Sequence, residues 1–206
     1  MTRVKICGIT TAEDAADAVE VGADALGFIF VPGTPRAVLP EAAERIVADL
    51  PPFVTTVGVF VDRPLQELLD IAARCRLQAV QLHGEESAEV ARCIPLRVIK
   101  GIRVKDAESL RPIGSYPAHA FLLDAFVEGV PGGTGSVLPW DLAARAKGRA
   151  PIILSGGLRP ENVDRAVRLV RPYGVDVSSG VEMRPGRKDR QKVREFIAAV
   201  RRADQS

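Results

Sequence analysis

Several residue types are scarce in this chain of 206 residues, and each scarcity argues against a class of protein. The three cysteines, Cys7, Cys75 and Cys93, are odd in number and have neither the paired spacing of a zinc site nor the density of a disulfide framework. Aromatic residues make up 5% and the formal net charge is +2, so we expect no stacking platform or basic stripe for nucleic acid. No apolar run is long enough to span a bilayer, and the N-terminus lacks a signal-peptide pattern. We therefore expect a cytoplasmic protein that binds neither nucleic acid nor membrane.

Hydrophobic residues are plentiful at 47%, enough for a sizeable core, and they recur in short runs rich in β-branched side chains. Eight such runs predict strands at 4–7, 25–30, 56–61, 79–82, 97–102, 120–123, 151–154 and 175–178. Segments with helical periodicity lie between most of them, at 40–49, 64–75, 87–93, 139–147, 159–170 and 189–201, with a short, weakly helical one at 106–111. An earlier helix is predicted to start with a capping box formed by Thr10 and Glu13 and to end at Gly22.

This alternation of strands and helices predicts parallel strand pairing, and near-continuous apolar strands predict burial on both faces. Eight units fit a closed α/β barrel, so we expect residues 1–206 to form a single (β/α)8 TIM-barrel domain. The alternative is a doubly wound open sheet. Against it, no Gly-x-Gly-x-x-Gly fingerprint follows the first strand, where a dinucleotide-binding fold carries it.

Two glycine-containing turns follow the last two predicted strands. Ile152–Leu154 continues into Ser155, Gly156 and Gly157, and the strand near Val177 continues into Ser178, Ser179 and Gly180. Small residues expose backbone N–H groups, and helix N-termini add partial positive charge, so oxygens of a phosphate can approach closely. Adjacent turns of this kind form the usual phosphate site of the barrel. We therefore expect a small phosphorylated substrate.

Polar residues at the C-terminal strand ends of a barrel are candidates for catalysis. Here they are Cys7, His83 and Asp124, with Arg36 in the loop after the second strand. The alternative for Cys7 is a buried structural thiol. For Asp124 it is a helix N-cap, although no helix is expected to start there.

Strand alternation and barrel closure also predict an ion pair inside the barrel between Lys5 and Asp176. The pair is either purely structural or a means by which Lys5 favours the thiolate of Cys7. Cys7 and Asp124 lie three strands apart, with the phosphate turns between them. That arrangement suits an acid and a base on opposite sides of one sugar phosphate.

A glycine-rich stretch at 129–135 follows the sixth predicted strand, on the active-site side of the barrel. We interpret it as a loop that covers the substrate, with an ordinary flexible loop as the alternative.

The chain resembles the phosphoribosylanthranilate isomerase family along its whole length. The motifs that carry the resemblance, in order, are Val4-Lys5-Ile6-Cys7-Gly8-Ile9-Thr10, Thr34-Pro35-Arg36, Val80-Gln81-Leu82-His83-Gly84, Gly132-Gly133-Thr134-Gly135, Ser155-Gly156-Gly157-Leu158 with Pro160-Glu161-Asn162-Val163, and Asp176-Val177-Ser178-Ser179-Gly180-Val181-Glu182 through Pro185-Gly186 and Lys188-Asp189. The first and last motifs together are highly specific.

The resemblance implies an Amadori rearrangement of N-(5-phosphoribosyl)anthranilate in tryptophan biosynthesis, with no cofactor and no metal. It implies that Asp124 is the general acid, that Cys7 is the general base and that Arg36 binds the anthranilate carboxylate. The implied phosphate ligands are Gly156, Gly157, Ser178, Ser179 and Gly180, and His83 and Asp176 line the pocket.

Two departures from the family pattern are visible. Ser136-Val137-Leu138-Pro139-Trp140 stands where a lysine and a Phe-Asp-Trp-type ending are common, and Thr34 replaces the more usual serine. A phosphoribosyl isomerase of histidine biosynthesis and a non-catalytic phosphosugar-binding barrel remain alternative functions. Both a monomer and a homodimer remain open.

Overall fold

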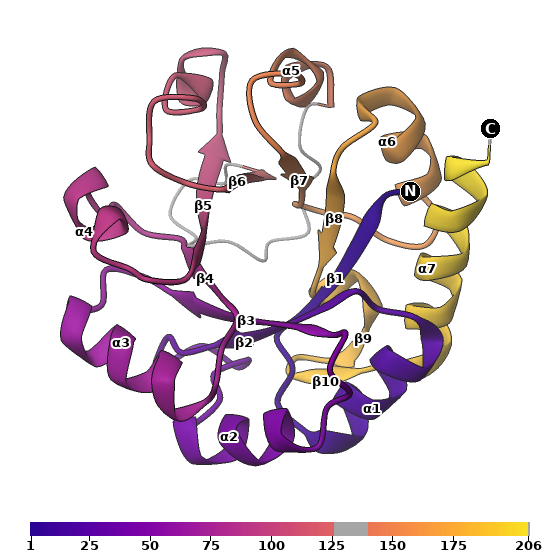
Figure 1. The fold of residues 1–206 in the computed structure, drawn as a ribbon. Helices are drawn as coiled ribbons and strands as arrows, with labels where there is room; N and C mark the ends of the chain where they lie inside the picture. Colours follow the sequence, from indigo (N-terminus) through magenta and orange to yellow (C-terminus); the bar gives the residue numbers. More distant parts are fainter. Residues whose placement is uncertain (126–139, 206) are drawn as a thin grey trace.

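The computed structural model describes residues 1–125 and 140–205, and its centre is a ring of parallel strands enclosed by helices (Figure 1). The strands of the ring are β1 (Arg3–Cys7), β2 (Ala25–Ile29), β3 (Thr55–Phe60), β4 (Ala79–Leu82), β5 (Arg97–Val104), β6 (Ala120–Ala125), β7 (Ile152–Leu154) and β8 (Gly174–Val177). The helices around it are α1 (Ala12–Val21), α2 (Pro40–Ala48), α3 (Leu65–Arg74), α4 (Ala88–Arg92), α5 (Trp140–Arg145), α6 (Val163–Val170) and α7 (Arg190–Asp204). Two short 3-10 helices are also present, η1 (Glu108–Leu110) and η2 (Ser179–Val181).

The ring is closed because β1 pairs with both β2 and β8. Lys5 lies opposite Ala25 of β2 on one side and opposite Asp176 of β8 on the other. Strand order follows chain order all the way round. The predicted (β/α)8 TIM barrel is therefore confirmed, and the open doubly wound sheet is excluded.

Apolar side chains form two separate clusters, as expected for strands buried on both faces. The larger cluster fills the layer between the strands and the helices and includes Ile6, Phe28 and Phe121. The smaller one lies inside the barrel and consists of Val57, Ala79, Ile99, Ala120, Leu122 and Ile153. Several charged or amide side chains of the barrel strands are buried as well, among them Lys5, Gln81, Asp124 and Asp176. The barrel interior is thus part apolar and part polar.

The start of α1 differs from the predicted capping box by one residue. Thr11, not Thr10, is the N-cap, and its side-chain oxygen accepts a hydrogen bond from the backbone N–H of Asp14 at 3.2 Å. The hydroxyl of Thr10 instead donates to the carbonyl of Gly186 at 2.6 Å, so a contact distant in sequence decides which threonine caps the helix. The predicted end of this helix at Gly22 is confirmed, because Gly22 has the left-handed conformation of a C-cap.

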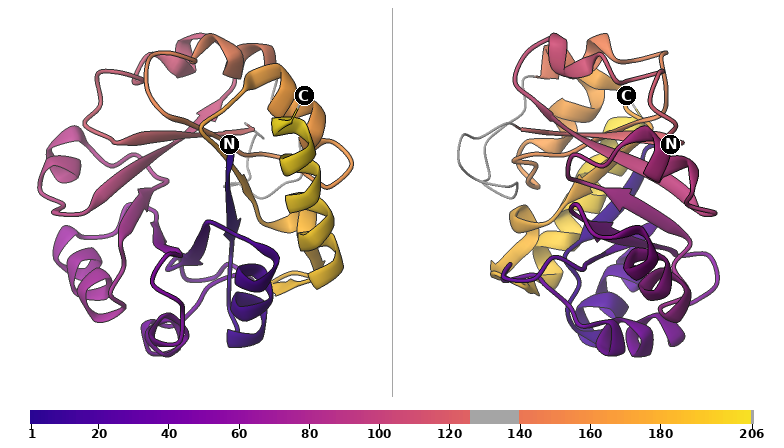
Figure 2. Two further views of the ribbon diagram at one scale, coloured as in Figure 1. Left: turned by 45° about the vertical axis from the view of Figure 1, so that its right-hand side comes forward. Right: turned by 90° about the vertical axis from the view of Figure 1, so that its left-hand side faces the viewer.

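A two-stranded antiparallel hairpin follows β8 and was not predicted. It consists of β9 (Glu182–Arg184) and β10 (Arg187–Lys188) and lies beside α1 in Figure 1. The long helix α7 then runs along the outside of the barrel and packs against α1 and α6 (Figures 1 and 2). The glycine-rich stretch at 129–135 lies outside the described residues.

Candidate active site

The site residues predicted from the sequence gather at the C-terminal ends of the barrel strands. Cys7 ends β1, His83 directly follows β4 and Asp124 lies near the end of β6. Arg36 reaches them from the loop after β2, because a Cβ on Gly8 would lie 3.0 Å from Cδ of Arg36 and 2.9 Å from Oγ of Ser178. Because Gly8, the residue after Cys7, has no side chain, the side chains of Arg36 and Ser178 can pack against its backbone.

Cys7 is buried, with 5% of its surface exposed, and its thiol lies against the neighbouring strand. A Cβ on Gly27, the residue opposite it in β2, would be only 2.7 Å from its sulfur, so only glycine leaves room for the thiol. Burial raises the pKa of Cys7 and outweighs the positive charge of Lys5, which acts to lower it. The nearby carboxylate of Asp176 also raises the Cys7 pKa, whereas the charge of Lys188 lowers it.

The predicted ion pair between Lys5 and Asp176 is present. Nζ of Lys5 lies 2.8 Å from Oδ1 of Asp176, and both side chains are almost completely buried. Burial opposes the charge on Lys5, but the charge of Asp176 and that of the Cys7 thiolate hold the Lys5 pKa above its ordinary value. Lys5 thus acts on Cys7 in the expected direction, although burial of the thiol has the larger effect.

Asp124 is buried on β6, and its two oxygens have different surroundings. Oδ1 accepts a hydrogen bond from the backbone N–H of Ala125 at 2.9 Å. Oδ2 lies 3.6 Å from Nε2 of His83, which comes from the far side of β5. One oxygen of Asp124 is therefore held by the backbone, while the other faces an imidazole whose ring N–H can stabilise the carboxylate form of Asp124.

The two glycine turns lie next to each other, as predicted. Gly156 and Gly157 both have positive φ angles, +80° and +65°, which glycine adopts without strain. The turn after β8 abuts them, since a Cβ on Gly180 would lie 1.9 Å from the carbonyl oxygen of Leu158. Asn162 stabilises the first turn: its Nδ2 donates to the carbonyl of Gly157 at 2.9 Å, and its Oδ1 accepts from the N–H of Arg159 at 2.8 Å.

Glu182 and Lys188, from the β9–β10 hairpin, form part of this site, and our reasoning from the sequence assigned them no role. Glu182 accepts two hydrogen bonds from Arg36, at 2.9 Å from Nε and 2.8 Å from Nη2, and a third from Nζ of Lys188 at 3.0 Å. Lys188 also donates to the carbonyl and hydroxyl oxygens of Ser178. The signal in the sequence was the number of charged residues, five of nine, in the segment 181–189 that follows the second glycine turn.

Electrostatics within this cluster are governed by burial and by close pairing. Burial acts to raise the pKa of Glu182, but the hydrogen bond from Arg36 and the charge of Lys188 together keep it below the ordinary value. Burial lowers the pKa of Lys188, and Glu182 offsets part of that effect. The cluster places positive charge beside the turn that carries Ser178, where an anion would be stabilised.

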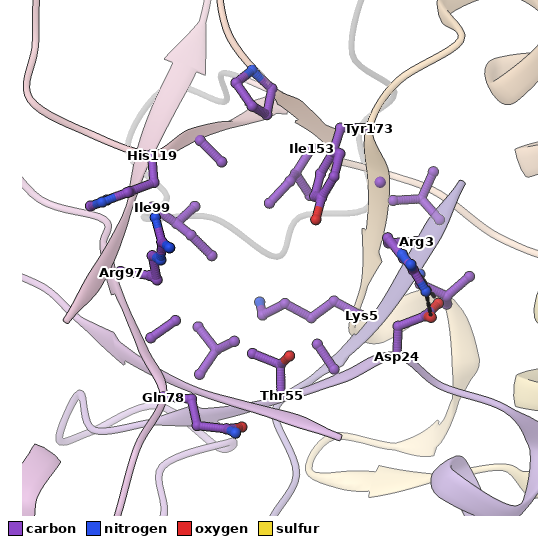
Figure 3. Close-up of a pocket in the computed structure, with 18 of the residues that line it drawn as sticks. Arg3, Lys5, Asp24, Thr55, Gln78, Arg97, Ile99, His119, Ile153 and Tyr173 are labelled. Atoms are coloured by element: carbon purple, nitrogen blue, oxygen red, sulfur yellow. Dashed lines mark hydrogen bonds and ion pairs between the residues drawn. The ribbon is translucent and has the colours of Figure 1, made fainter. Parts of the chain in front are cut away.

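The opposite end of the barrel is hollowed by a cavity of about 660 Å³, lined by residues at the N-terminal ends of all eight strands (Figure 3). Arg97, His119 and Tyr173 stand around it, and Lys5 extends toward its middle (Figure 3). Lys5 connects this cavity to the predicted site, because it pairs with Asp176 and interacts with Cys7. The predicted catalytic residues Cys7 and Asp124 thus lie at the opposite end of the barrel from this cavity.

Within residues 1–125 and 140–205, no group of three His, Cys, Asp or Glu side chains is placed to hold a metal ion. Among the same residues, none of the helices has the length and apolar character needed to cross a membrane.

Comparison with known proteins gives a consistent answer. The sequence profile of the family described as N-(5'phosphoribosyl)anthranilate (PRA) isomerase matches residues 4–199. The chain belongs to this isomerase family. It is 58% identical over 197 residues to N-(5'-phosphoribosyl)anthranilate isomerase from Geobacter sulfurreducens, which covers 96% of this chain and 97% of that protein.

Two solved structures extend the comparison to the fold. One contains monomers generated from the dimeric phosphoribosylanthranilate isomerase of Thermotoga maritima, with a TM-score of 0.89, 43% identity and coverage of 98% of this chain and 99% of the other. The second is a phosphoribosylanthranilate isomerase in complex with reduced 1-(o-carboxyphenylamino)-1-deoxyribulose 5-phosphate, with a TM-score of 0.89, 45% identity and the same coverage. The resemblance noted in the sequence therefore extends to the family and to the barrel.

Proposed function

We propose that this chain catalyses the Amadori rearrangement of N-(5-phosphoribosyl)anthranilate to 1-(2-carboxyphenylamino)-1-deoxyribulose 5-phosphate, a step of tryptophan biosynthesis. The observation that carries the proposal is the position of Cys7 and Asp124. They lie at the C-terminal ends of β1 and β6, and the two glycine turns that follow β7 and β8 lie between them around the ring. A phosphate held at those turns leaves the sugar between a thiol and a carboxyl group.

Asp124 acts first, as the general acid. Its proton passes to the ring oxygen of the ribose, the bond from C1 to that oxygen breaks, and the lone pair of the anthranilate nitrogen forms a C=N double bond to C1. The product is a protonated Schiff base and a carboxylate on Asp124. The hydrogen bond from the backbone N–H of Ala125 becomes charge-assisted at that moment, so it strengthens as the carboxylate forms.

Cys7 acts second, as the general base in its thiolate form. It removes the proton from C2, the electrons of that C–H bond form a double bond between C2 and C1, and the electrons of the C=N bond return to nitrogen. The resulting enolamine tautomerises to the ketone at C2. Burial of Cys7 raises its pKa, which makes the thiolate scarcer at neutral pH but a stronger base where it is present.

Substrate binding uses both ends of the molecule. We assign the phosphate to the backbone N–H groups of the turns at Gly156, Gly157, Ser178, Ser179 and Gly180, and to the neighbouring charge of Lys188. Arg36 binds the anthranilate carboxylate. Glu182 occupies only two of the five N–H groups of Arg36, so the guanidinium is held in place while donors remain for a ligand. His83 and Asp176 line the pocket.

The decisive experiment compares turnover with binding. Cys7→Ala and Asp124→Asn should each reduce consumption of phosphoribosylanthranilate, generated in situ and followed by fluorescence, by orders of magnitude. Both variants should still bind the reduced product analogue, because the phosphate and carboxylate contacts are intact. Cys75→Ala is the matched control, since Cys75 is a buried thiol on the outer side of the barrel. Parallel loss of binding and turnover would make the two residues structural. Turnover of the histidine-pathway substrate alone would replace the proposed reaction.

We further propose that two copies of the chain associate through the N-terminal end of the barrel. Phe53 is 96% exposed and Tyr173 is 57% exposed, and both line the cavity at that end. Exposed large apolar side chains that gather around one cavity are typical of a protein interface, whereas a single exposed apolar side chain is not. The related enzyme from Thermotoga maritima is described as dimeric, which supports the same state here.

Light scattering after size-exclusion chromatography tests this association. The unmodified chain should have the mass of two chains, and Phe53→Asp should have the mass of one. Leu39→Asp is the control, because Leu39 is 72% exposed but does not line the cavity. A single-chain mass for the unmodified protein would refute the dimer.

We also infer that residues 1–206 form one domain. We infer a reducing, cytoplasmic location, since the free thiol of Cys7 must stay reduced to act as a base.

A further inference from the structure

Gln81 is a buried amide on β4 that takes no part in the proposed chemistry. Only 2% of its surface is exposed, and both ends of its side chain have a polar partner. Oε1 lies 2.9 Å from Nζ of Lys5, and Nε2 lies 3.0 Å from Nδ1 of His83. It therefore joins the ion pair of Lys5 and Asp176 to the imidazole beside Asp124.

The direction of these hydrogen bonds follows from what each group can donate. A lysine ammonium has three donors and no acceptor, and the pairing with Asp176 raises the pKa of Lys5, so Lys5 stays charged. The oxygen of the Gln81 amide must therefore face Lys5, and its NH₂ group must face His83. Nδ1 of His83 then accepts a hydrogen bond through its lone pair, which leaves the ring hydrogen on Nε2.

Nε2 is the nitrogen that faces Asp124, 3.6 Å from Oδ2. The ring has little freedom to move, because a Cβ on Gly101 of β5 would be 2.5 Å from Nδ1 of His83. A hydrogen on Nε2 is thus directed at the carboxyl oxygen that the backbone does not occupy. The contact is long for a hydrogen bond, but such contacts tighten during catalysis, and this one gains a charge once Asp124 has lost its proton.

We propose that Gln81 is a positioning residue for the acid step, and this rests on the proposed role of Asp124. Because the amide oxygen of Gln81 accepts from Lys5, its NH₂ group faces His83 and keeps the ring hydrogen on Nε2. That N–H stabilises the Asp124 carboxylate as the sugar ring opens. The interaction strengthens only when the charge forms, so it contributes to kcat more than to substrate binding.

Two substitutions separate this proposal from a structural role. Gln81→Glu keeps the shape and the acceptor for Lys5 but presents a second acceptor to His83, so Nδ1 must now carry a hydrogen. Gln81→Met keeps the length and removes both hydrogen bonds, so the ring hydrogen is no longer held on Nε2. In each variant kcat should fall about 10- to 100-fold, by analogy with the loss of partners that orient metal-bound histidines. KM should change less than threefold.

The direct measurement is the ¹⁵N NMR spectrum of the two histidines, His83 and His119. His119 is an internal control, because its Nδ1 accepts from the backbone N–H of Val98 at 3.1 Å and its hydrogen is likewise held on Nε2. In the unmodified protein both rings should carry hydrogen on Nε2. In Gln81→Glu, Nδ1 of His83 should move to the protonated range while His119 stays unchanged.

Each other outcome would overturn the proposal. If His83 keeps its hydrogen on Nε2 in both variants, Gln81 does not control the tautomer. If the tautomer changes while kcat is unchanged, the hydrogen does not assist Asp124. Failure of the proposed function is visible separately, since the unmodified protein would then not consume phosphoribosylanthranilate. Failure of the acid role alone would leave Asp124→Asn with turnover, whatever the NMR spectrum of His83 shows.

Discussion

Lys5→Met removes the cation that pairs with Asp176 inside the barrel, and its consequences follow from the contacts of Lys5. The ammonium lies 2.8 Å from Asp176 and 2.9 Å from Gln81. Met has a similar length and no charge. Asp176, 6% exposed, would keep a longer hydrogen bond from Ser155 at 3.4 Å as its remaining side-chain contact among those described. Removal of one partner of a buried ion pair costs about 3–5 kcal/mol. Against a usual total of about 5–15 kcal/mol, the variant should fold but be clearly less stable in urea.

The same substitution acts on the Cys7 thiol. Burial already raises the pKa of Cys7, and Lys5 is the strongest influence that lowers it. Without Lys5 the pKa should rise further, and each unit of rise reduces the thiolate fraction tenfold at a pH well below the pKa. Rates of alkylation by iodoacetamide as a function of pH report this value. The background should be Cys75→Ala and Cys93→Ser, so that Cys7 is the only thiol.

The double variant Lys5→Met with Asp176→Leu is the control. Replacement of both charges by apolar side chains should recover most of the lost stability, since no unpaired carboxylate remains. The Cys7 pKa should stay above that of the unmodified protein, because the influence of Lys5 exceeds the opposite influence of Asp176. A loss below about 1 kcal/mol in the single variant would be no more than a surface pair contributes. Together with an unshifted or lowered Cys7 pKa, it would refute the reasoning.

Three further outcomes can be measured directly. The pKa of Cys7 is raised and its thiolate is the active form, so log kcat/KM should climb from neutral pH toward alkaline pH, and a flat profile would argue against Cys7 as the base. Gly156→Ala should cost more stability and activity than Gly33→Ala. Both glycines have φ of +80°, but only at Gly156 would the new Cβ collide, at 2.8 Å from Oδ1 of Asp124. Equal effects of the two substitutions in melting and activity assays would show that backbone strain alone decides the outcome. Arg36→Met should raise KM about 10- to 100-fold, the loss of one or two hydrogen bonds to a charged group, and an unchanged KM would contradict carboxylate binding by Arg36.

Local sequence pattern was sufficient for the barrel strands. Each predicted strand lies within two residues of the observed one, for example 97–102 against Arg97–Val104 and 175–178 against Gly174–Val177. Buried parallel strands are short apolar runs bounded by polar residues, and that signal is local in the chain. Alternation along β1 and β8 was also enough to predict the Lys5–Asp176 pair, once closure of the barrel was assumed.

Predictions were wrong or incomplete where a distant segment competes for a local group. The sequence around α1 offers two threonines as caps, and the carbonyl of Gly186 decides between them by engaging Thr10. The β9–β10 hairpin was missed because two- and three-residue strands carry almost no periodicity. With it, Glu182 and Lys188 were given no role, although they hold Arg36 and contact Ser178.

The sequence by itself therefore determined the order of the strands and helices, the burial of the strands and the residue types available for acid–base chemistry, since these depend on nearest neighbours in the chain. The tertiary structure alone decided the balance of forces on Cys7, where burial exceeds the effect of Lys5, and the direction of the hydrogen bonds from Lys5 through Gln81 to His83. Desolvation and hydrogen-bond direction depend on every group that surrounds an atom. In a closed barrel those groups come from strands far apart in the chain.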